Sequence, residues 1–85
     1  LRAPGWPVGP GNLEEGLALA RKAVELRPAY APNALALGEA LARNGDKAAA
    51  RRAYARALEL ARAAAAAGEP DAAGWAREAE ARLKE

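Results

Sequence analysis

The sequence predicts an all-α fold, an antiparallel helix-turn-helix stack of about four helices closed by a C-terminal capping helix. Apolar residues recur every three or four positions in four separate stretches, which is the helical period. Each stretch is bounded by Gly, Pro, Asn or Asp, residues that start or stop helices. Alanine, the strongest helix former, occupies 27 of the 85 positions. Because only eleven leucines, two valines, two tryptophans and two tyrosines add bulk, we expect one small domain with a thin core.

Residues 1–11 are expected to form an arm or linker, with the helical domain spanning residues 12–85. The arm contains three prolines and three glycines. Proline lacks a backbone N–H and glycine has the freest backbone, so no helix is expected here. Its large apolar residues Trp6 and Val8 either pack on the domain or stay exposed, where Trp6 could contact a partner.

The first helix is expected over residues 12–27. Asn12 is a good N-cap, and Glu15 stands three positions later, which is the capping-box spacing. Pro28 ends the helix, because a residue before proline is disfavoured in the helical conformation. Its apolar stripe is predicted to consist of Leu13, Leu17, Ala20 and Val24, widened by Leu19, Ala23 and Leu26.

The second and third helices are separated by a turn at Asn44–Gly45. The second is expected to begin near Pro32, which suits a first-turn position, and to end at that turn because glycine readily becomes left-handed. Asp46 is expected to cap the third helix, which continues through the alanine run to Ala67 and stops at Gly68.

The fourth helix is expected to begin after the N-cap Asp71. One face contains Ala72, Trp75, Ala76, Ala79 and Leu83. Glu78 with Arg82, and Glu80 with Lys84, have the i,i+4 order that favours ion pairs along a helix.

A 34-residue shift aligns residues 22–26 with residues 56–60. The intervening segment contains Leu37-Gly38, Gly45, Ala50, Tyr54 and Ala57. These spacings resemble the tetratricopeptide repeat (TPR) family over residues 13–62. The resemblance implies half a repeat, one full repeat from Ala31, and the fourth helix as a cap. The chain departs from the family pattern at Ala34, Leu41, Lys47 and Arg62.

The TPR reading assigns packing roles to the signature residues. Gly38 and Ala50 are expected to let two helices approach closely, Tyr54 to fill the gap beside them, and Trp75 to anchor the capping helix. A lone repeat cannot bury its apolar face. We therefore expect the helix of Val24 to leave apolar surface for the arm, a second copy or further chain to cover.

A weaker likeness concerns the run that begins at Pro10 and continues to the Trp75 helix. It is similar to C-terminal TPR segments of bacterial extracytoplasmic proteins, some of which accompany TRAP-type solute transporters.

The residue alphabet disfavours catalysis. The chain has no Ser, Thr, Cys or His, which removes the usual nucleophiles, the imidazole base and the soft metal ligands. We therefore expect no enzyme activity, no cofactor and no metal site. The TPR resemblance instead implies a protein–protein interaction or assembly scaffold that binds a peptide or protein segment. Its groove-facing positions would be Leu35, Glu39, Ala42 and Arg43.

Alternatives remain at this stage. The family's carboxylate clamp uses Lys and Asn in the groove, which this chain lacks there. Glu39 and Arg43 could simply form an exposed i,i+4 ion pair. The domain could be structural and self-associate as a homodimer. It could also bind nucleic acid weakly through Arg51, Arg52 and Arg56, although a solvated helix face explains these arginines as well.

Charge and termini say little about partners or compartment. The net charge is +2 and the signs alternate along the chain. No apolar run reaches the roughly 20 residues that span a bilayer, and no targeting segment is visible. The chain starts at Leu1 without methionine, so we expect a fragment of a larger protein. Its richness in Ala, Arg, Gly and Pro suggests GC-rich, bacterial coding.

Overall fold

The computed structural model describes residues 10–85, and all its regular elements there are helices. They are α1 (Pro10–Leu26), α2 (Ala31–Arg43), α3 (Lys47–Ala66) and α4 (Ala72–Lys84). The all-α prediction is confirmed. The proposed arm lies mostly outside the described residues, as do both alternatives for Trp6 and Val8.

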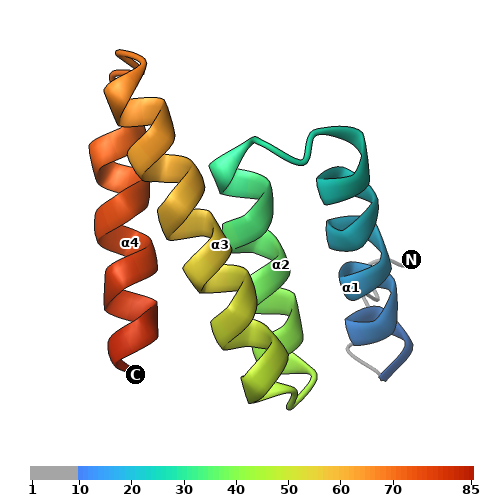
Figure 1. Ribbon diagram of the computed structural model, residues 1–85. Helices are drawn as coiled ribbons and strands as arrows, with labels where there is room; N and C mark the ends of the chain where they lie inside the picture. Colours follow the sequence, from blue (N-terminus) through green and yellow to red (C-terminus); the bar gives the residue numbers. More distant parts are fainter. Residues whose placement is uncertain (1–9) are drawn as a thin grey trace, which may run out of the picture.

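Successive helices run antiparallel and form a row, with α4 at one end and α1 at the other (Figure 1). Helix α3 packs between α2 and α4, and α2 also touches α4. Helix α1 packs against α2 alone in the described part of the chain. One side of α1 is therefore left without a neighbouring helix. None of the four helices is long and apolar enough to cross a membrane.

Helix α1 begins earlier than the sequence indicated. It starts at Pro10, so the expectation that residues 10 and 11 are non-helical was wrong, and Asn12 lies within the helix instead of capping it. Proline is tolerated here because N–H groups of the first turn have no intrahelical acceptor to lose. The other end agrees with prediction, since α1 stops at Leu26 just before Pro28.

The turns on either side of α3 were predicted correctly. Gly45 and Gly68 adopt left-handed φ values of 85° and 92°, which a side chain would disfavour. Asp46 caps α3, because its Oδ1 accepts a hydrogen bond from the Ala49 N–H at 3.1 Å.

Asp71 is the N-cap residue of α4, but its side chain forms no capping bond. Its φ and ψ of −90° and −5° are helical. An N-cap side chain usually reaches the first-turn N–H groups from an extended backbone. The sequence therefore predicted the N-cap residue correctly, but the Asp71 side chain does not form the capping hydrogen bond. Glu69 instead accepts a hydrogen bond from the Asp71 N–H at 3.5 Å.

The core lies between α2, α3 and α4. Tyr54 is 5% exposed, which confirms it as a core residue. The buried small and aliphatic residues around it are Ala31, Ala34, Leu35, Leu41, Ala50, Ala53, Ala57, Leu60, Ala61 and Ala79. No described residue of α1 is buried.

Gly38 makes room for the Tyr54 ring. A Cβ atom placed on Gly38 would lie 2.5 Å from Cε1 of Tyr54, and its three nearest neighbours would all be atoms of that ring. The close approach is therefore between the α2 backbone and an α3 side chain. Ala50, the other residue expected to allow a close helix approach, is buried in α3.

Trp75 connects α4 to the turn between α1 and α2. It is half-buried against the core, and its ring meets Tyr30 edge-on with centroids 5.6 Å apart. The Arg27 guanidinium also contacts Tyr30 and lies over its ring, 4.2 Å from the ring centroid. Sequence reasoning gave Tyr30 no role, because it falls outside the TPR signature positions.

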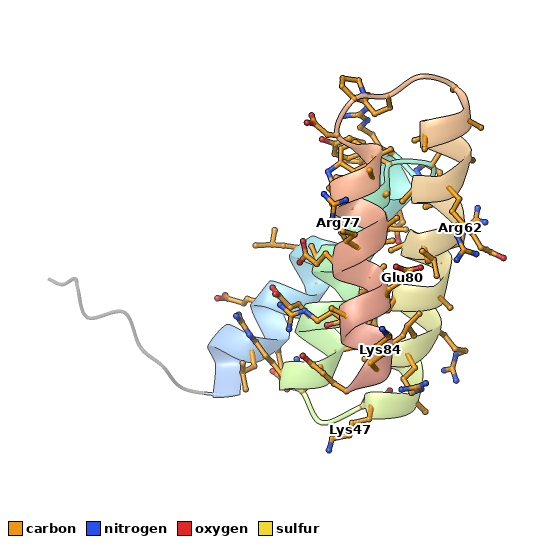
Figure 2. All side chains as sticks on the ribbon, turned by 90° about the vertical axis from the view of Figure 1, so that its left-hand side faces the viewer. Lys47, Arg62, Arg77, Glu80 and Lys84 are labelled. Atoms are coloured by element: carbon orange, nitrogen blue, oxygen red, sulfur yellow. The ribbon has the colours of Figure 1, made fainter. Side chains whose placement is uncertain are left out.

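The ion pairs of α4 reach other helices. A carboxylate oxygen of Glu80 lies 3.4 Å from a guanidinium nitrogen of Arg62 on α3 (Figure 2). Along α4, Glu80 stands between the exposed residues Arg77 and Lys84. Arg82 pairs with Glu39 of α2 at 2.9 Å. The expected partners Lys84 and Glu78 take no part in these pairs. Tertiary packing thus replaced the local i,i+4 pairs with pairs between helices.

Candidate interaction surface

The four predicted partner-binding residues do not form one surface. Leu35 is only 7% exposed and belongs to the core, although it also borders a hollow of about 290 Å³ beside Trp75. Glu39 is half-buried, and its carboxylate accepts a hydrogen bond from Arg82 instead of pairing with Arg43. The reason is that α4 packs beside this edge of α2 and covers it.

The other two residues lie on different sides of the molecule. Ala42 borders a hollow formed with the start of α3 and the end of α4, near Tyr54 and Arg82. Arg43 instead lines a groove between α1 and α2. Glu39 borders this groove together with Arg43, and it also borders a second hollow together with Leu35, beside Trp75 of α4.

This α1–α2 groove has a volume of about 370 Å³. Its α2 side is lined by Ala36 and Ala40, with Glu39, Arg43 and Asn44 completing that side. Its α1 side is lined by Leu13, Gly16, Leu19 and Ala20. Small residues on both helices keep the groove open, so side chains of another segment could enter it.

The outer face of α1, which consists of Gly16, Leu19, Ala23 and Leu26, continues from this groove. Leu19 and Leu26 are each 71% exposed, and Leu13 nearby is 42% exposed. Leu19 and Leu26 are seven residues apart, or about two helical turns, so they point in nearly the same direction. A single exposed leucine is ordinary, but an aligned pair beside an apolar groove is typical of contact surfaces.

Two asparagine side chains fix α1 against α2. Asn33 Nδ2 donates a hydrogen bond to the Ala23 carbonyl at 3.1 Å, near the end of α1. Asn44 Nδ2 donates to the Leu13 carbonyl at 3.3 Å, near its start. Since the two bonds hold opposite ends of α1, the groove is formed in advance of any binding.

The arginines of α3 are largely engaged in the fold. Arg51 donates a hydrogen bond to the Leu83 carbonyl at 2.9 Å, where a cation suits the C-terminus of α4. Arg56 pairs with Glu59 on its own helix at 3.3 Å. Arg52 and Arg56 also border a separate groove of about 340 Å³ that is lined by residues of α1, α2 and α3. Within residues 13–85, Arg52 forms no hydrogen bond or ion pair through its side chain.

The fold changes the ionisation of the Tyr54 side chain. Burial raises the pKa of its phenol above the ordinary value of 10.0, and the nearby Arg82 guanidinium opposes that rise. The neutral phenol serves packing in the core, where it contacts Gly38. In the described residues there is no cluster of His, Cys, Asp and Glu that could hold a metal ion.

The sequence predicted uncovered apolar surface on the helix of Val24, but the partner-binding groove was assigned to α2 alone. Leu19 and Leu26 were also assigned to the same apolar stripe as Leu17, whereas both are 71% exposed. Comparison of the chain with protein-family models, with curated proteins and with solved structures finds no match.

Proposed function

We propose that this protein is a non-catalytic interaction module that binds a protein segment through the outer face of α1 and the α1–α2 groove. The main observation in support is that Leu19 and Leu26 are each 71% exposed. They lie on a helix that two asparagine side chains hold against α2. Exposed apolar side chains on a fixed helix can be buried by a partner without a large ordering cost.

The TPR-like arrangement supports this proposal. If α2 and α3 form a full repeat, α1 corresponds to the second helix of an incomplete one. The missing first helix would pack on α1 and α2, which is where the α1–α2 groove lies. The groove therefore has the position and apolar lining suited to a helical segment. We extend the proposal to a scaffold role within a larger, bacterial polypeptide.

The groove also suggests what such a segment contains. Small residues line it on both sides, so it favours leucine-sized side chains at helical spacing. Glu39 and Arg43 supply one charge of each sign at its border. Because Glu39 already pairs with Arg82, Arg43 is the stronger attraction for a charged residue of the ligand.

Selection from a random peptide library displayed on phage tests the proposal. The full chain is the bait, the Leu19→Asp variant is the counter-selection bait, and Glu14→Gln on the solvent side of α1 is the matched control. We expect peptides with leucines at helical spacing that bind the wild type and the control but lose at least tenfold in affinity on Leu19→Asp. The proposal fails if no enriched peptide distinguishes wild type from Leu19→Asp and the chain also does not associate with itself.

A further inference from the structure

We propose that the segment bound at α1 is the α1 helix of a second copy of this chain, packed antiparallel about a two-fold axis. This inference rests on the proposed function and names the partner. It follows from the spacing of residues on the outer face of α1 and from the charges beside that face.

The outer face of α1 has the spacing of a helix–helix contact. Gly16, Leu19, Ala23 and Leu26 are separated by three, four and three residues, as apolar positions are where two helices pack along their length. This face borders the α1–α2 groove through Gly16 and Leu19, and it points away from the side of α1 where Leu17 packs against the core. Helix α1 thus has two apolar faces, and the described part of the chain covers only one of them.

Small and large residues alternate along the outer face. Gly16 has no atom within 4 Å of the position that a Cβ would take, so it leaves room for a large side chain from outside. In an antiparallel pair centred near the middle of α1, Leu19 of one copy lies beside Gly16 of the other. The same contact occurs twice, because a two-fold axis makes the interface self-complementary.

Charges select the antiparallel orientation. Glu15 and Lys22 are exposed, lie seven residues apart along the same edge of the outer face, and form no ion pair within residues 13–85. In an antiparallel pair centred midway between them, Glu15 of each copy lies next to Lys22 of the other. In a parallel pair, Lys22 of one copy would instead lie next to Arg27 on the opposite edge of the other copy's face. These like charges would repel.

The expected dimer is weak. A stable interface usually buries about 800 Å² on each partner, and one pair of short helices buries less. Within residues 10–85, α1 lies at the end of the row of helices and packs against α2 alone (Figure 1). Association is therefore expected to depend on concentration and, because the ion pairs are exposed, on ionic strength.

Sedimentation equilibrium of the full chain at low ionic strength tests the proposal. We expect the average mass to rise from one chain toward two across about a hundredfold increase in concentration. Leu19→Asp should keep the chain monomeric throughout, with a circular dichroism spectrum and melting curve like those of the wild type in dilute solution. A wild type that stays monomeric over this range overturns the proposal.

Charge reversal tests the orientation. Glu15→Lys and Lys22→Glu each turn two attractions into two repulsions, so each variant should dimerise about tenfold more weakly than the wild type. An equimolar mixture of the two variants should regain dimers, because the pairs between different variants are again attractive. Glu14→Lys and Arg21→Glu make the same charge changes on the solvent side of α1 and should leave association unchanged.

The remaining outcomes are decisive as well. A dimer that persists in Leu19→Asp, or a mixture that does not recover, excludes antiparallel α1 pairing. If the chain stays monomeric while displayed peptides bind in a Leu19-dependent way, the second copy is the wrong partner and the proposed function stands. If neither occurs, both fail.

Discussion

Helices α2 to α4 and helix α1 are built from the same kinds of residues but are packed very differently. The three-helix body encloses Tyr54 and a layer of alanines, and its helices are joined by ion pairs such as Glu39–Arg82. Helix α1 has regular geometry but touches only α2 and contains no buried residue in its described part. Two asparagine hydrogen bonds fasten it to the body.

This contrast shows that alanine content alone does not create a core. In the body, the Tyr54 ring packs over Gly38 and lies among the buried alanines. Helix α1 contains leucines, which are larger than the alanines of the body, yet two of these leucines remain 71% exposed. The body therefore supplies stability, and α1 supplies surface for binding.

The largest expected contrast concerns large-to-small substitutions. Tyr54→Ala should lower the free energy of unfolding by about 3–5 kcal/mol, because it opens a cavity in the body. Leu17→Ala on the inner face of α1 should cost about 1–2 kcal/mol, since that side chain is only half-buried. Urea unfolding in dilute solution measures both. Equal losses would mean that α1 belongs to the same core.

Two glycine substitutions should have opposite signs. Gly38→Ala should destabilise the protein by about 1–3 kcal/mol, because the new Cβ overlaps the Tyr54 ring. Gly16→Ala in α1 meets nothing within 4 Å, so better helix propensity should make it neutral or stabilising by up to about 1 kcal/mol. Thermal melts of both variants in dilute solution check this. A neutral Gly38→Ala would contradict the assigned packing of Tyr54.

The attachment of α1 can be weakened without touching the body. Asn33→Ala removes the hydrogen bond to the Ala23 carbonyl and should cost about 0.5–1.5 kcal/mol. We expect the loss mainly as faster amide exchange in the last turns of α1, with α3 unchanged. Exchange measured by NMR distinguishes this from a uniform loss of stability, which would show that α1 and the body unfold as one unit.

The smallest effect should appear only in alkaline solution. Burial raises the pKa of Tyr54, so the folded state holds the phenolic proton more tightly than the unfolded state does. Its contribution to stability is complete below the ordinary pKa of 10.0 and is lost as the pH rises through the raised value. Urea unfolding against pH should show this loss in the wild type and not in Tyr54→Phe. Parallel curves would exclude Tyr54 as its source.

Local signals predicted most of the fold. Glycine at a left-handed turn and aspartate before a helix depend only on nearby backbone, so the turn at Gly45 and the cap at Asp46 followed from sequence. The burial of Tyr54 followed from its place in the repeat pattern. The start of α1 was missed because proline is compatible with both a linker and a first helical turn.

Features that depend on contacts between helices could not be predicted in the same way. The burial of Leu35 was not predicted, because the position of α4 against α2 cannot be read from helix periodicity. Arg82 has a carboxylate four residues before it, yet it pairs with Glu39, which lies far away in sequence. The uncovered side of α1 was expected from the incomplete repeat, but its exposed leucines and the groove were identified only from the structure.

Hydrogen–deuterium exchange of the full chain at two protein concentrations tests the central contrast most directly. We predict that, in dilute solution, amides of α1 exchange through local opening, well before those of α2 to α4. At high concentration, exchange should slow in α1 while the body keeps its rates. Identical protection of α1 and α3 at both concentrations would contradict the division between a stable body and a binding helix.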